Sequence, residues 1–599
     1  MKQLKYKVII LLVIFGVVTF FACKKDFLNR PPQGVLAPST LANATGVQAI
    51  LVGAYHALLG ETNWGSAPSN WVFGSVVGGD SYKGSIASDQ GDITNLENWS
   101  YNVDNPYLDQ KWLAVYHGIQ RANDVLRTMA LAKDISAADQ AEIAGEARFL
   151  RGYWHLEAKK MWKNVPYIGE GTTLDSALLV SNVDASGNYV DIYPEIEADF
   201  TYAMNNLPAI QMQGNKIIPG RANKWAAACF LAKTYMFEHK YAQAKALFDQ
   251  IIASGTTASG AKYALVPFEQ NFNAATDNSA ESVFAVQNSV NDGSGTNGNY
   301  GDNLNFPNGG GPGGCCGFNN PSISLANSYK TGADGLPLPA TFNTGNNVSD
   351  PTTPYTGTLD PRLDWTVGRP GIPYLDWGPY PKNSWIRDLS GDGWMSPKKN
   401  VYPQSATGTV SSTETSFWGP TQMDAVNTNL MRFSDVLLMA AEAEVEVGTL
   451  HQATTYVNMV RARAADPKGW VYKNSAYSAA TGTYAVNATP ADNYLIKTYP
   501  SDFSDKATAL TAIHFERKLE LGMEGQRFFD LQRWDNGTGS MAAELNAYAA
   551  AEYSRPGFFS FNQGAKFTAG KNEIYPIPLQ EIDAQNSKGK TLLKQNPGY

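Results

Sequence analysis

Two stretches of this 599-residue chain combine aromatic rings with polar side chains among many glycines. A sugar ring has an apolar C–H face that stacks on an aromatic side chain, while its hydroxyl groups form hydrogen bonds with amides and carboxylates. The sequence therefore predicts a sugar-binding surface built from residues 60–106 and 289–425. Its candidate ligand-binding residues are Trp71 and Tyr82 in the first stretch, and Tyr300, Asn303, Cys315, Cys316 and Phe318 in the second.

Cys315 and Cys316 are adjacent, in the run Gly-Gly-Cys-Cys-Gly-Phe. In an oxidising compartment such neighbours can form a vicinal disulfide. We expect this disulfide, or Phe318, to supply the flat apolar floor under a bound sugar. The alternative is that the two cysteines only pack the loop, because polarizable sulfur fills irregular gaps well.

A possible calcium loop begins at Asp388. The run Asp388-Leu-Ser-Gly-Asp392-Gly places oxygen ligands at alternate positions before a glycine turn, but its twelfth position is Lys399 instead of the usual bidentate glutamate. A simple Asp/Gly turn is the competing interpretation. The sequence thus offers Asp388 and Asp392 as a structural calcium site and predicts no cofactor.

Sequence motifs of catalysis are missing. None of the six histidines is followed by glutamate, no Gly-x-Ser-x-Gly occurs, and Ala584 stands where the Gly-Lys-Thr at 589–591 would need glycine to form a phosphate loop. We therefore expect a binding protein and not an enzyme. A surface glycoside hydrolase remains the alternative, since two carboxylates can meet in space without any motif. The net charge of −8 argues against nucleic acid as a partner.

The N-terminus predicts export and lipid anchoring. Three lysines precede an uncharged apolar run, residues 8–22, as in a secretory signal, and Ala22-Cys23 resembles the lipobox of bacterial lipoproteins. We expect 1–22 to be a signal peptide, Cys23 to be acylated, and 23–46 to be a tether. Cleavage before Cys23 would take the charge from −8 to −11 by removing the three lysines. An ordinary exported protein with an incidental cysteine is the alternative.

Apolar residues at helical spacing predict the elements that must position these loops. Helices are expected at 47–59, 112–126, 136–162, 191–207, 507–534 and 541–552. Two further segments, 221–252 and 433–464, match the paired helices of a tetratricopeptide repeat, with Tyr235 and Phe248 between the helices of the first and Gly448 at the turn of the second. The chain should therefore be mostly α: a tetratricopeptide-like helical superhelix with a large irregular, loop-rich ligand-binding region.

Several long strings resemble signature segments of the SusD/RagB family. They are GEARFLRGYWHLEAKKMWKNVPYI (145–168), MRFSDVLLMAAEAEVEVG (431–448), HFERKLELGMEGQRFFDLQRW (514–534) and the ending that begins EIYPIPLQEID at 573. The resemblance implies a helical part at 47–288, a ligand-binding region at 289–425 and a second helical part at 426–599. Within 514–534, glutamates and arginines on the same face of a helix usually brace it through ion pairs, so we assign them a scaffold role and no ligand role.

The resemblance further implies a function. Members of this family are acylated outer-membrane lipoproteins that hold glycans for uptake and cap a SusC-like TonB-dependent transporter, although some bind peptides. We expect this chain to bind an oligosaccharide or polysaccharide and to act as the lid of such a transporter, with peptide binding as the alternative. The same resemblance places it on the outer membrane facing the exterior. One departure is Lys24-Lys25, where outward-facing members tend to carry acidic residues.

Overall fold

A computed structural model describes residues 38–381, 383–414, 420–555, 558–587 and 592–599. The predicted signal peptide and Cys23 lie outside these ranges. Among the described helices, none has the length and apolar character needed to cross a membrane.

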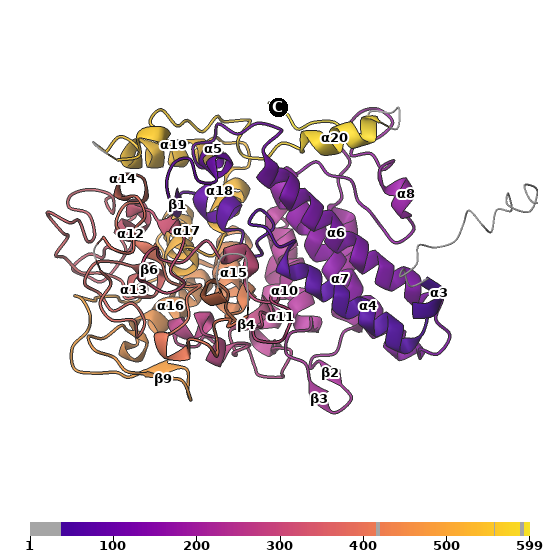
Figure 1. The fold of residues 1–599 in the computed structure, drawn as a ribbon, viewed down its shortest axis with the longest axis horizontal. Helices are drawn as coiled ribbons and strands as arrows, with labels where there is room; N and C mark the ends of the chain where they lie inside the picture. Colours follow the sequence, from indigo (N-terminus) through magenta and orange to yellow (C-terminus); the bar gives the residue numbers. More distant parts are fainter. Residues whose placement is uncertain (1–37, 382, 415–419, 556–557, 588–591) are drawn as a thin grey trace, which may run out of the picture.

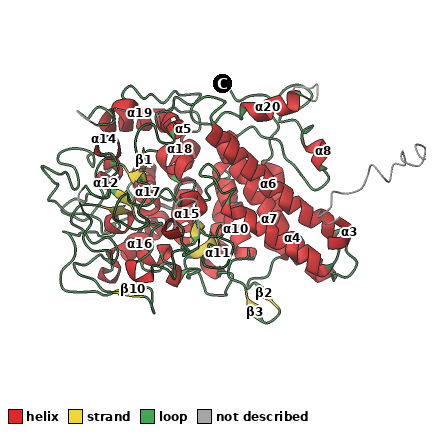
Figure 2. Ribbon diagram, viewed as in Figure 1, coloured by secondary structure: helices red, strands yellow, loops and turns green. Residues whose placement is uncertain are grey.

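Helices dominate the fold, and those of the first half follow the predicted pattern closely (Figures 1 and 2). Local caps explain their starts: Ser136 Oγ accepts a hydrogen bond from the Asp139 amide at the beginning of α7, and Pro106 occupies the first turn of α6. The bounds are α3 (Pro38–Leu41), α4 (Ala44–His56), α5 (Gly91–Glu97), α6 (Pro106–Met129), α7 (Ala137–Trp162), α8 (Leu174–Ala177), α9 (Tyr193–Asn206), α10 (Lys224–Phe237) and α11 (Tyr241–Ser254).

The second half of the chain begins with short helices inside the loop-rich region and ends with longer ones. They are α12 (Ile323–Ser328), α13 (Leu363–Thr366), α14 (Leu389–Asp392), α15 (Phe433–Val447), α16 (Leu450–Ala465), α17 (Lys506–Leu521), α18 (Arg527–Asp535), α19 (Ser540–Glu552) and α20 (Leu579–Asn586).

The two predicted helix pairs are confirmed as α10 with α11 and α15 with α16. Phe248 is fully buried and Tyr235 half-buried in the first pair, and Gly448 makes the turn of the second. A Cβ added at Gly448 would meet the carboxylate of Glu444, so this side chain would have to shift. Because α11 also packs on α15, the two pairs form one continuous scaffold despite their distance in sequence.

The strands form antiparallel two-stranded ribbons: β1 (Ser81–Gly84) with β5 (Phe318–Pro321), β2 (Met212–Gln213) with β3 (Lys216–Ile217), β4 (Ser282–Val286) with β8 (Thr428–Arg432), β6 (Val367–Gly368) with β7 (Ser396–Pro397), and β9 (Tyr477–Ser478) with β10 (Thr483–Tyr484). The β1–β5 ribbon matters most for the site, because it aligns Tyr82 with Asn320 and so joins the two stretches predicted to bind ligand.

Two sequence predictions need correction. The single helix expected at 507–534 is interrupted between α17 and α18, where Gly525 has a positive φ of 67° and an added Cβ would lie 2.0 Å from the Ser69 carbonyl oxygen. Helix α17 has already ended at Leu521, and the close approach at position 525 requires a glycine in the connection to α18. The last part of the predicted tether is also helical, since the Asn43 side chain caps the start of α4 by accepting from the Gly46 amide.

The loop-rich region is not separate from the scaffold. Its residues Cys316 and Phe318 belong to the same apolar cluster as the long helices. A second cluster joins Trp365 of the region to Phe515 and Leu519 of α17. The loops therefore rest on shared cores, which hold their backbone in place without regular secondary structure.

A buried ion network reinforces this attachment. Glu520 of α17, fully shielded from water, contacts Arg362 at 2.8 Å, Arg432 at 2.5 Å and Arg463. Burial alone would raise the pKa of Glu520, but these three guanidinium groups outweigh it and hold the pKa well below 4.5. Arg362 lies in the loop-rich region, so the network ties that region to the helices. The ion-pair partners of Glu520 thus lie on other elements and not on α17 itself.

Candidate functional site

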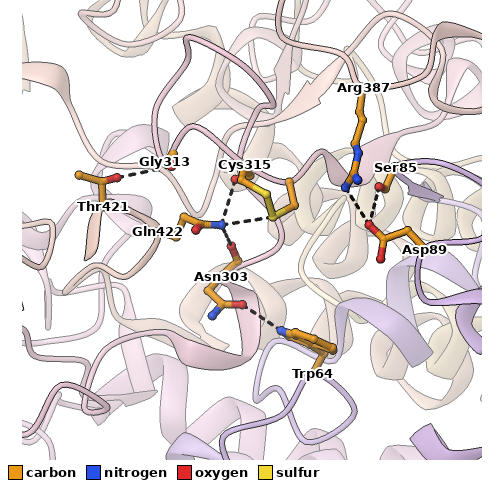
Figure 3. Close-up of a disulfide and its surroundings, with 10 residues drawn as sticks. Trp64, Ser85, Asp89, Asn303, Gly313, Cys315, Arg387, Thr421 and Gln422 are labelled. Atoms are coloured by element: carbon orange, nitrogen blue, oxygen red, sulfur yellow. Dashed lines mark hydrogen bonds and ion pairs between the residues drawn. A yellow bond between two sulfur atoms is a disulfide. The ribbon is translucent and has the colours of Figure 1, made fainter. Parts of the chain in front are cut away.

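A vicinal disulfide joins Cys315 and Cys316 at the surface of the loop-rich region (Figure 3). Cys316 is buried, whereas Cys315 is half-buried and adjoins Gly314, which is exposed. Gly313 and Gly314 both have positive φ angles, near 75°, so the chain can turn tightly into the cysteine pair. The disulfide predicted from the sequence is therefore present, with one of its two residues reaching the surface.

A buried glutamine fastens the disulfide to the rest of the site (Figure 3). Gln422 Nε2 donates to the carbonyl oxygens of Asn303 (3.1 Å) and Cys315 (3.4 Å) and lies 3.4 Å from Cys316 Sγ. The Asn303 side chain in turn accepts a hydrogen bond from the Trp64 indole at 2.9 Å. This chain of contacts positions segments that lie more than 350 residues apart in sequence.

Two half-buried aromatic residues stand on these segments. Trp64 is held by its bond to Asn303, and Tyr300 opens the short 3-10 helix η5 (Tyr300–Asp302) just before Asn303. Cys315 comes to the same group through Gln422. The arrangement has the parts of a sugar-binding platform, namely half-buried aromatic residues beside fixed polar groups.

Charged side chains lie at a further edge of the surface. Arg387 Nη1 pairs with Asp89 Oδ2 at 2.8 Å, and the same oxygen accepts from Ser85 Oγ at 2.9 Å (Figure 3). Lys83 stabilises the loop that carries Ser85 and Asp89. Its Nζ donates to the carbonyl oxygens of Ile86 and Asp89 at 2.7 Å each. Burial lowers the pKa of Lys83. Arg387 and Asp89 remain partly exposed and can bond to hydroxyl groups.

Other residues proposed from the sequence lie beneath this surface. Trp71, in the short π-helix η2 (Trp71–Val76), is 1% exposed, donates its indole N–H to Gly301 O at 2.9 Å and packs edge-on against Phe318. Phe318 is equally buried, and Asn303 uses its side chain to orient Trp64. These three residues support the surface from below.

Tyr82 lies deepest of the proposed residues. It is fully buried in β1, donates its hydroxyl to Glu552 and accepts from the Ile323 amide at 2.9 Å. Its ring packs against Phe559 at 4.4 Å. Burial raises its pKa well above 10. Because the strand is covered on both sides, the ring that looked available in the sequence belongs to the core.

A small cavity of about 70 Å³ lies beside Trp71. Six asparagines are among the residues that line it: Asn299, Asn305, Asn319, Asn400, Asn427 and Asn429. Burial raises the pKa of Asp302, on the same wall, to about 6. Ligand cavities usually measure roughly 300–1,000 Å³, whereas this volume suits on the order of five water molecules.

The residues of the possible calcium loop have local roles. Asp388 caps α14, its Oδ1 accepting from the Ser390 amide at 2.9 Å, and Asp392 Oδ2 accepts from the Asp388 amide at 3.1 Å. This is the geometry of the competing Asp/Gly turn. Within the described ranges no group of three or more His, Cys, Asp or Glu side chains is arranged to hold a metal ion.

Sequence reasoning missed some residues of the site. Gln422 and Arg387 carry no motif, and they reach the site only because chain folding brings residues 303, 315 and 89 to them. Trp64 had one available signal, a tryptophan in a polar loop, but nothing local separates it from the buried Trp71. Distant contacts decide which of the two rings reaches solvent.

Two family models match the chain. The model described as SusD family matches residues 280–599, and the one described as starch-binding associating with outer membrane matches residues 26–236. The first match alone covers more than half of the chain.

Similar proteins cover nearly its whole length. SusD-like protein P25 of Formosa agariphila is 24% identical over 96% of both chains, and SusD-like protein P2 of the same organism is 23% identical over the full length of both. Among solved structures, a laminarin binding SusD-like protein superposes with a TM-score of 0.57 at 23% identity, covering 93% of this chain and all of the other. Surface glycan-binding protein A from Bacteroides thetaiotaomicron, in complex with laminarihexaose, gives 0.57 at 18% identity over 92% and 99%.

These structures share the fold of a helical scaffold carrying long loops. The match of residues 280–599 to the family model, together with the signature strings and the paired helices, shows that the chain belongs to the SusD family.

Proposed function

We propose that this protein binds a glycan on the surface around the Cys315–Cys316 disulfide and passes it to a SusC-like TonB-dependent transporter of the outer membrane, without catalysing a reaction. The proposal rests on one arrangement. Half-buried residues Trp64, Tyr300 and Cys315 and the partly exposed ion pair Arg387–Asp89 belong to the same two loop regions. Apolar rings and a sulfur floor suit the C–H face of a sugar, and the charged pair suits its hydroxyl groups.

Similar proteins support the ligand class. One solved relative is named for laminarin and another was solved with laminarihexaose. Anchoring through acylated Cys23 is proposed from the lipobox-like N-terminus, and exposure to the exterior and the role of lid from the family resemblance. They are tested by external protease treatment of intact cells and by co-purification with a TonB-dependent transporter from detergent-solubilised membranes.

The ligand proposal is tested with the soluble chain 24–599 on a glycan array and on a peptide panel. Tyr300→Ala should weaken glycan binding by roughly 5- to 30-fold, since a stacked ring contributes about 1–2 kcal/mol and 1.4 kcal/mol is tenfold. Tyr300→Phe keeps the ring and should bind within about twofold of the unchanged chain. Binding confined to peptides would overturn the glycan assignment.

Catalysis is tested in the same preparation. Incubation with every polysaccharide that the array identifies should release no reducing ends. Release that survives purification to homogeneity would instead support the surface glycoside hydrolase, the second candidate from the sequence.

A further inference from the structure

A large groove lies between the ends of three scaffold helices. Its volume is about 1,020 Å³, and none of its lining residues belongs to the loop-rich region 289–425 that carries the disulfide surface. This volume is at the upper end of the range of small-molecule sites, so the groove can hold several sugar units. It is therefore a second location large enough for an oligosaccharide.

The groove exists because three helices stop at its walls. Helices α7, α10 and α18 each end there, and the residues that follow turn the chain aside in left-handed conformations: Lys163 at φ 58°, His239 at 58° and Asn536 at 41°. Such residues end helices sharply, so the chain leaves each helix without crossing the space beyond it. The helix ends thus frame a hollow of fixed shape.

Aromatic side chains face this hollow. Tyr189, Tyr193 and Phe237 all line the groove and are half-buried. Cations lie close to two of the rings, with Lys159 Nζ 4.6 Å from the Tyr193 ring centre and Lys594 Nζ 4.8 Å from that of Tyr189. The Tyr189 hydroxyl donates to the Gln595 carbonyl at 2.6 Å, which fixes the ring. Fixed rings of this kind are suited to stacking on sugar faces.

Several charged side chains of the groove bond to partners within the protein. Lys159 Nζ bonds to Asp191 at 3.0 Å, Arg533 forms a two-pronged pair with Glu442 outside the groove, and Asp535 accepts from the Met541 amide at 2.9 Å. A ligand with a strong net charge would compete with these pairs. The lining therefore favours an uncharged ligand that offers many hydroxyl groups.

Part of the rim is bare backbone. Gly537, Gly539 and Gly570 have φ angles of 81°, 81° and 76°, and a Cβ added at any of them would meet no atom within 4 Å. The left-handed conformation requires glycine, and the missing side chains leave the rim open to a ligand.

From these observations we infer that the groove is a second glycan-binding site, for a neutral oligosaccharide. The inference rests on the proposed function for the class of ligand, but its residues are independent of the disulfide surface.

The test measures binding stoichiometry by isothermal titration calorimetry on chain 24–599. The probes are laminarihexaose, cellohexaose, maltohexaose, xylohexaose and mannohexaose. With a hexasaccharide that binds, the unchanged chain should take up two molecules. Tyr189→Ala should weaken one of the two sites and Tyr300→Ala the other, each by roughly 5- to 30-fold, and the double variant should bind weakly at both. Tyr189→Phe keeps the ring and should still bind two.

A second variant guards against misfolding of the first. Ala569 is exposed and lines the groove, so a larger side chain at this position would extend into it. Ala569→Trp should therefore block the groove and reduce the stoichiometry to one. The control Ala569→Ser should leave the stoichiometry at two. A stoichiometry of one for the unchanged chain, with binding weakened by Tyr300→Ala and unaffected by Ala569→Trp, overturns the second site and leaves the proposed function standing. No binding of any probe by the unchanged chain overturns both.

Discussion

The buried carboxylate of Glu520 offers the sharpest test of how the loop-rich region is held on the scaffold. Glu520→Gln keeps the shape of the side chain but removes the charge that faces Arg362, Arg432 and Arg463. The glutamine also presents an N–H₂ group to donors. Removing one partner from a buried ion pair costs about 3–5 kcal/mol, and we expect a loss of that size in the free energy of unfolding at pH 7.

The pH dependence gives a second check on the same variant. The folded protein holds the pKa of Glu520 well below 4.5, so this group stabilises the fold fully above its unfolded pKa and loses that contribution as the pH falls toward its folded pKa. Glutamine does not titrate. The difference in stability between the unchanged chain and the variant should therefore shrink as the pH falls below about 4.5.

Urea denaturation followed by tryptophan fluorescence measures both effects, since the chain has 14 tryptophans. The matched control is Glu446→Gln, because Glu446 pairs with Lys506, whose side chain is 57% exposed; such exposed pairs contribute less than about 1 kcal/mol. A loss below about 1 kcal/mol for Glu520→Gln, or an equal loss at pH 7 and pH 3, would refute the reasoning.

Two further predictions concern buried groups near the ligand surface. Tyr82→Phe removes a hydroxyl that bonds to Glu552 and to the Ile323 amide, so it should lower the free energy of unfolding by about 1–3 kcal/mol. Glycan affinity should stay within twofold of that of the unchanged chain. A large loss of affinity in a stable variant would show that Tyr82 contributes to the ligand site. Burial raises the pKa of Glu97 to about 7, and a carboxyl group with a raised pKa loses its contribution to stability as the pH rises from about 4.5 through that value. Glu97→Gln should therefore be more stable than the unchanged chain by about 1–3 kcal/mol at pH 8 and by little at pH 4, as measured by urea denaturation; an equal difference at both values would contradict this assignment.

The helical scaffold follows from the sequence because its signals are local. Apolar spacing, the cap at Ser136 and the turn at Gly448 each act within a few residues, and all three are present in the structure. Where a local pattern met a long-range demand, the pattern failed. The sequence predicts one helix over 507–534, yet α17 ends at Leu521, and the connection to α18 passes so close to the Ser69 carbonyl that position 525 must be glycine.

The same distinction between local signals and long-range contacts holds for the candidate site. Residue types in the two polar stretches determined the expected chemistry, rings and amides for a sugar, and the adjacent cysteines allowed a disulfide. Tertiary structure decided which rings could serve: Trp71 and Tyr82 are buried by segments from residues 301–323 and 552, while Trp64 and Tyr300 keep part of their surface. Exposure is a property of everything that packs over a side chain, and for these loops that packing comes from partners hundreds of residues away.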